Sequence, residues 1–201
     1  LDARVTLARP TRPGCGRLAI RPYPRELEEW IPIAEGRRLK LRPIRPEDEP
    51  SLREAFAKLT PEEVRLRFFV PMPALSHEAA ARLTQIDYDR EMALILTEPG
   101  VAEQDEIYAV VRLIADPDNA RAEFAIIVRQ AMAGRGLGTL LMRRILDHAR
   151  GRGIGEVFGV VLPDNTAMLR LCDKLGFERR PNPGEPGTVL VTFDPGAKRE
   201  T

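Results

Sequence analysis

The chain has 201 residues, 43 % of them hydrophobic and 30 % charged, which is typical of one soluble globular domain of ordinary size. A net charge of +1 and an aromatic content of 5 % argue against nucleic-acid binding, because they provide neither a basic field nor a base-stacking platform. No apolar run approaches the roughly 20 residues of a membrane-spanning helix, and two histidines and two cysteines disfavour a zinc site. We therefore expect a cytoplasmic protein without metal, nucleic-acid partner or membrane association.

Residues 1–36 are rich in proline and arginine and predict an extended arm or the tail of a preceding domain. The chain begins at Leu1 with neither an initiator methionine nor a signal-peptide pattern, so we expect a piece of a longer protein. The pattern becomes regular after Gly36. We predict a folded domain over residues 37–195 and a C-terminal tail over residues 196–201.

The pattern of apolar runs and turn signals predicts an α+β domain. Helices are predicted to start near Glu47, Thr60 and Ser76, where acidic residues or a following proline favour a first turn, and to cover 138–152 and 165–175. Short apolar runs between turn residues predict strands. These strands cover 38–44, 92–97, 107–115, 122–129, 156–162 and 189–193. The second to fourth of them are expected to form an antiparallel meander.

A glycine-rich turn joins the strand ending near Val128 to the helix that follows. Gly134, Gly136 and Gly138 alternate there, so that backbone N–H groups can converge without obstruction by Cβ atoms. The helix N-terminus adds roughly half a positive charge, which suits a pyrophosphate. A Gly-Lys-Ser/Thr ending is missing, which excludes a P-loop, and Thr139 stands where a dinucleotide fingerprint needs its third glycine. A plain connecting turn remains the alternative.

Two motifs resemble those of the GNAT acetyltransferase family. Ala133 to Gly138 matches the nucleotide motif Gln/Arg-x-x-Gly-x-Gly/Ala, with Ala133 replacing the usual Gln or Arg. Asn165 to Phe177 matches the second signature and ends in Leu-Gly-Phe, with Cys172 where many members carry a tyrosine proposed as general acid. The resemblance covers about residues 38–194.

The resemblance implies a mixed sheet of about six or seven strands flanked by helices, splayed between its fourth and fifth strands, with acetyl-CoA as co-substrate in the splay. Main-chain atoms of the fourth strand would pair with the pantetheine, and Asn165 would both cap its helix and contact CoA. For Cys172, a buried packing thiol and a proton donor both remain open. The implied cofactor-binding residues are Ile126, Ile127, Val128, Gly134, Arg135, Gly136, Leu137, Gly138, Thr139, Asn165 and Cys172.

Glu123 is the predicted catalytic residue. Attack on a thioester needs a neutral amine, and only about one lysine in a thousand is neutral near pH 7.4, so a base in reach is useful. A carboxylate in an otherwise apolar strand is costly unless it faces a polar cavity, and the resembled lysine acetyltransferases carry a catalytic glutamate at the matching position. We expect Glu123 to act through a water, while an ion pair with Arg112 or Arg121 is the alternative. The family also implies a strand bulge near Val128 that frees an N–H for the thioester oxygen.

A narrower resemblance points to the substrate. Residues 18–24, 41–48 and 63–69 are similar to the junction and domain of large bacterial protein lysine acetyltransferases, in which a catalytically silent acyl-CoA-synthetase-like region precedes a C-terminal GNAT domain. That group acetylates, and so inactivates, AMP-forming acyl-CoA synthetases, acetyl-CoA synthetase above all. We therefore expect a protein lysine N-acetyltransferase with such a partner. The alternatives are a GNAT acting on a small amine or a protein N-terminus, and a non-catalytic acetyl-CoA-sensing module.

Overall fold

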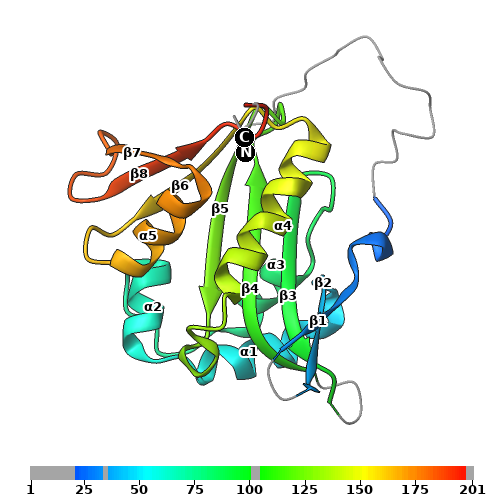
Figure 1. Ribbon diagram of the computed structural model, residues 1–201. Coiled ribbons are helices and arrows are strands. Elements are labelled where there is room, and N and C mark those ends of the chain that lie inside the picture. The colour runs from blue at the N-terminus through cyan, green and yellow to red at the C-terminus, as the bar shows by residue number, and fades with distance from the viewer. Residues whose placement is uncertain (1–20, 34–35, 101–104, 198–201) are drawn as a thin grey trace, which may run out of the picture.

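The computed structural model describes residues 21–33, 36–100 and 105–197 and shows one mixed sheet with helices on both faces (Figure 1). The eight strands lie in the order β1-β2-β3-β4-β5-β6-β8-β7. The α+β class is confirmed, with eight strands where six or seven were expected. The strands are Glu29–Pro32 (β1), Arg38–Pro43 (β2), Glu91–Glu98 (β3), Glu106–Ala115 (β4), Arg121–Val128 (β5), Glu156–Val161 (β6), Glu178–Pro181 (β7) and Val189–Phe193 (β8).

The two additional strands lie at the edges of the sheet. Strand β1 pairs antiparallel with β2 and buries Ile31, so the sheet begins before the boundary predicted at Gly36. Most of the expected arm, residues 1–20, lies outside the described residues. Strand β7 pairs antiparallel with β8 at the opposite edge.

Two helical layers cover the sheet. Helices α4 (Leu137–Arg152) and α5 (Thr166–Leu175) pack on one face, whereas α1 (Glu49–Ala57), α2 (Pro61–Phe68) and α3 (His77–Thr84) pack on the other (Figure 1). Helix α4, predicted over residues 138–152, buries an apolar stripe in the larger core. Helix α2 begins as its sequence predicts, because the Thr60 hydroxyl accepts from the Glu63 N–H and the Glu63 carboxylate accepts from the Thr60 N–H. No helix in the described ranges is long and apolar enough to cross a membrane.

The sheet splits between β5 and β6, which are the fourth and fifth of the strands predicted from the sequence. These parallel strands pair only from Arg121 with Glu156 to Glu123 with Phe158, and they diverge beyond that point (Figure 1). By contrast, β4 and β5 stay paired from Ala115 with Ala122 to Ala109 with Val128. The expected splay is therefore present, and it leaves the second half of β5 with one free edge.

Candidate active site

A cleft of about 620 Å³ opens where β5 and β6 separate. Helix α2 and the loop after it form one wall, the glycine-rich turn closes one end, and α5 borders the other side. The cleft thus brings together the glycine-rich turn and the start of α5, which carry the two sequence motifs and are distant in sequence. Among its lining residues are Glu63, Arg67, Phe68, Glu123, Ile126, Ile127, Val128, Gly134, Gly136, Leu137, Gly138, Thr139, Asn165 and Met168.

The glycine-rich turn has the backbone that its sequence predicts. Gly134 has φ +76° and Gly136 φ +75°, left-handed values that a side chain rarely adopts. Gly136 is the N-cap of α4, and the N–H groups of the first helical turn have no partner within the helix. Gly138 has no positive φ, and a Cβ there would make an ordinary contact of 3.4 Å with the Leu171 side chain, so its conformation and packing do not require glycine. The helix dipole and these N–H groups make this end of the cleft a site for an anion.

Asn165 and Cys172, both predicted to contact the cofactor, lie in different environments. The Asn165 side chain accepts a hydrogen bond of 3.1 Å from the Met168 N–H, so the predicted N-cap of α5 is present, and Asn165 also lines the cleft. Cys172, on α5, is fully buried in the larger core, and this burial raises the pKa of its thiol to about 12. The structure therefore corrects the assignment of Cys172 to the cofactor site and favours the packing alternative. Arg135 is exposed in the turn and is not part of the cleft wall.

The free edge of β5 offers main-chain groups to the cleft. Within the described chain, pairing of β5 with β6 ends at Glu123, so the groups of residues 124–128 that point toward β6 have no strand partner. The register of β4 with β5 is unbroken as far as Val128, and the Arg129 N–H donates to the Tyr108 carbonyl at 3.0 Å. The bulge expected near Val128 is thus absent from the paired stretch. Free donors arise from the splay itself.

Glu123 is exposed on β5, at the last pair before the strands separate, and its side chain lines the cleft. Both arginines considered as its partners are engaged elsewhere: Arg112 pairs with Glu91, and Arg121 pairs with Glu156 at 2.6 Å. Among residues 21–33, 36–100 and 105–197, no salt bridge or hydrogen bond involves the Glu123 carboxylate. The structure therefore leaves it available to water or ligand.

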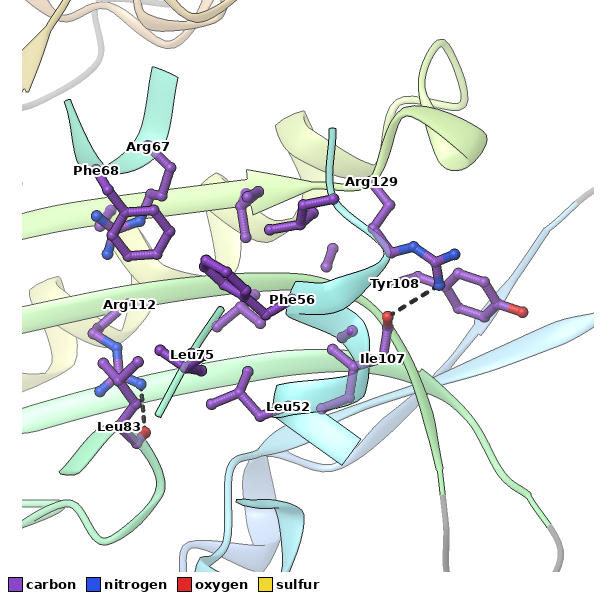
Figure 2. A pocket seen from close by; sticks show the side chains of 16 residues that line it. Leu52, Phe56, Arg67, Phe68, Leu75, Leu83, Ile107, Tyr108, Arg112 and Arg129 are labelled. Atoms are coloured by element: carbon purple, nitrogen blue, oxygen red, sulfur yellow. Dashed lines mark hydrogen bonds between the residues drawn. The ribbon is translucent and has the colours of Figure 1, made fainter. Parts of the chain in front are cut away.

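Two arginines flank Glu123 on the side of the sheet covered by α1, α2 and α3. Arg112 stands opposite Ala125 on β4, is buried, and donates to the Leu83 carbonyl at 2.5 Å. Burial and the nearby Arg112 lower the pKa of Arg67, and the charge of Glu123 opposes this effect. Figure 2 shows the Arg67 guanidinium beside the Phe68 ring, at 4.8 Å from its centroid. Sequence spacing gave no signal for this cluster, because its members come from α2, β4 and β5.

These features define an acyltransferase architecture, and the comparisons agree. The family model "Acetyltransferase (GNAT) domain" matches residues 38–178. The chain therefore belongs to the GNAT acetyltransferase family and is an acetyl-CoA-dependent acyltransferase.

Three proteins with similarity to most of this chain are acetyltransferases of the same kind by name. "Acetyltransferase PA5475" of Pseudomonas aeruginosa is 29 % identical over 166 residues, which cover 82 % of this chain and 89 % of that protein. "Acetyltransferase Pat" of Mycolicibacterium smegmatis is 28 % identical over 148 residues, covering 73 % of this chain but only 43 % of the longer protein. The crystal structure of the GNAT domain of S. lividans PAT superposes with a TM-score of 0.75 at 28 % identity, covering 86 % of this chain and 99 % of that domain.

Proposed function

We propose that this domain is a protein lysine N-acetyltransferase that modifies, and so inactivates, an AMP-forming acyl-CoA synthetase such as acetyl-CoA synthetase. The main support for Glu123 as the catalytic base is that its carboxylate, at the point where the sheet splits, has no ion-pair or hydrogen-bond partner among the described residues. Similarity to the two Pat proteins over most of the chain supports the choice of substrate, together with the sequence resemblance to lysine acetyltransferases.

In this proposal the turn holds the CoA pyrophosphate and the free edge of β5 holds the pantetheine. The thioester then lies beside the second half of β5, close to Glu123. Gly134 and Gly136 leave room for the phosphates, and first-turn N–H groups of α4 donate to them. With Ala133 in the first motif position, backbone donors supply the binding that a side chain supplies in other members.

Glu123 would accept the proton of the lysine ammonium, directly or through one water. Because the neutral amine costs about 4 kcal/mol at pH 7.4, a positioned base lowers the barrier. The neutral nitrogen bonds to the acyl carbon, the C–S bond breaks, and the thiolate leaves with the electron pair. The second proton of the nitrogen is lost to solvent or to the thiolate. Cys172 takes no part, since its thiol is buried and its raised pKa makes it a poor proton donor.

The proposal is tested by incubating the domain with acetyl-CoA and acetyl-CoA synthetase, then mapping acetyl-lysine by mass spectrometry and assaying the synthetase. We expect one dominant acetylated lysine and loss of synthetase activity. Glu123→Gln should bind acetyl-CoA normally by calorimetry and lose about 100-fold or more in kcat. Glu178→Gln, an exposed glutamate on the edge strand β7, is the matched control and should keep full activity.

Three outcomes would contradict the proposal in different ways. Preferential labelling of polyamines or of protein N-termini would assign another acceptor. Tight acetyl-CoA binding with no thiol release on any amine would indicate a sensing module. Full turnover of Glu123→Gln would remove this residue from the role of base while leaving the acceptor assignment intact.

A further inference from the structure

A second cavity, of about 70 Å³, lies between the sheet and the layer of α1 and α2 (Figure 2). Its walls are mainly apolar. Figure 2 shows Leu52 and Phe56 of α1, Phe68 and Leu75 surrounding the space. Val110 of β4 lines the cavity from the sheet. Nothing in the proposed binding of CoA uses this space.

The cavity adjoins the cleft. Arg67, Phe68, Ala125 and Ile127 line both spaces, so one wall of side chains separates them. Ala125 contributes only a methyl group to this wall, and it lies two residues after Glu123 on the same face of β5. A thioester held beside this part of β5 therefore places its acyl carbon next to the opening.

The lining of the cavity indicates what it can hold. Its charged residues are all arginines: Arg67, Arg112 and Arg129. Two of them are already neutralised, Arg112 by Glu91 and Arg129 by Glu106 at 2.8 Å. Cationic walls repel the ammonium of an acceptor lysine, and the apolar remainder disfavours any charged group far from Arg67. A neutral aliphatic chain meets neither penalty.

The volume sets the length of that chain. A water needs roughly 10–15 Å³ of space on this measure, so a cavity of about 70 Å³ has room for the one to three carbon atoms that a three- to five-carbon acyl chain adds to acetyl. We propose that it is an acyl-chain pocket, and that the domain binds straight-chain acyl thioesters of three to five carbons, such as propionyl-CoA and butyryl-CoA, in addition to acetyl-CoA. The inference rests on the proposed position of the thioester beside β5. The transfer chemistry is the same as for acetyl, because the added methylenes only occupy the cavity.

The test compares binding of free CoA, acetyl-CoA and butyryl-CoA by calorimetry, which requires no acceptor. Each buried methylene contributes about fourfold in affinity, so butyryl-CoA, with two more methylenes, should bind about 15-fold more tightly than acetyl-CoA. Ala55→Leu fills the cavity from α1 and should bring that ratio close to one without weakening acetyl-CoA binding. Ala57→Leu is the matched control, since it makes the same change on the exposed face of α1 and should keep the ratio.

Equal affinities in the parent domain, or a ratio that survives the filling of the cavity, would overturn the inference. Tighter binding of succinyl-CoA than of butyryl-CoA would overturn it as well, by assigning the cavity to an anionic group facing Arg67. If Ala55→Leu unfolds, Leu59→Phe fills the same space from just beyond the end of α1 and should likewise bring the affinity ratio close to one. Failure of acetyl-CoA itself to bind would instead refute the proposed cofactor site, so the two results are distinguishable.

Discussion

Replacing Gly159 with alanine tests the packing beside the point where β5 and β6 separate. Gly159 lies on β6, one residue beyond the last pair with β5. A Cβ there would lie 2.5 Å from Cε1 and 2.8 Å from Cζ of Phe124, distances that real structures do not show. The Phe124 ring cannot easily move aside, because Phe177 packs against it with centroids 5.3 Å apart and Phe193 packs behind Phe177 at 5.1 Å. Gly159→Ala must therefore displace a strand or a cluster of three rings.

Overpacking of this kind costs about 1–3 kcal/mol. At about 2–4 °C per kcal/mol for a chain of this size, we expect the Tm of Gly159→Ala to fall by about 6 °C. Phe124 also lines the cleft, so acetyl-CoA affinity should fall with it. Thermal unfolding followed by circular dichroism, urea unfolding and calorimetry with acetyl-CoA measure the three effects.

Two further variants decide whether sterics are the cause. Gly151→Ala places the same methyl group in α4, where nothing lies within 4 Å, and should stabilise the domain by about 0.5–1 kcal/mol. Phe124→Leu vacates the space, so adding Gly159→Ala to it should cost little beyond Phe124→Leu alone. Undiminished stability of Gly159→Ala, or a cost that Phe124→Leu fails to relieve, would refute the reasoning.

Three other perturbations test the frame around the cleft. Asp48→Asn removes a carboxylate that accepts from buried Arg42 at 2.6 and 2.7 Å, and urea unfolding should show a loss of about 3 kcal/mol; a change under 1 kcal/mol would contradict this. Gly136→Ala puts a side chain at φ +75°, so we expect about 1 kcal/mol of destabilisation and weaker CoA binding by calorimetry. Burial, assisted by Arg152, lowers the pKa of His148 from 6.5 to about 4, so the unfolded chain takes up a proton that the native state does not. This contribution to stability is complete above pH 6.5 and is lost as the pH falls toward 4. In His148→Gln, the midpoint of urea unfolding should therefore change less with pH between 4 and 6.5.

Periodicity and cap residues were sufficient to predict the long elements. The predicted ranges 138–152 and 165–175 agree with α4 and α5, because burial of a helix face and capping, here by Asn165 and Gly176, are local requirements. The strand pair that splays was predictable only from family resemblance. The packing of the Phe124 ring on Gly159 beside the split depends on two strands meeting in space, so no local pattern predicts it.

The elements and residues that were missed are those that tertiary partners determine. Strand β7, Glu178–Pro181, is exposed at every position, so it has no apolar alternation, and its pairing with β8 alone makes it a strand. Strand β1 buries only Ile31. No sequence pattern singled out Arg67, which packing of α2 on β5 places in the wall between cleft and cavity. Burial of Cys172, by contrast, was one of the two readings of the sequence, and the face that α5 presents to the core favours it.

In the proposed arrangement, one segment, strand β5, serves cofactor, acceptor and acyl chain at once. Phe124 and Ile126 point into the core beneath α4 and fix the strand. Glu123, Ala125 and Ile127 point to the opposite face, where they meet the cleft and the smaller cavity. The edge of β5 left free by the splay presents main-chain N–H and C=O groups in the plane of the sheet, toward β6. Because a strand's side chains alternate while its hydrogen-bonding groups lie in the plane of the sheet, these three roles do not compete. In that arrangement, moving the proposed base by one residue, to position 122 or 124, would bury the carboxylate under α4, whereas position 123 places it in the cleft at the split.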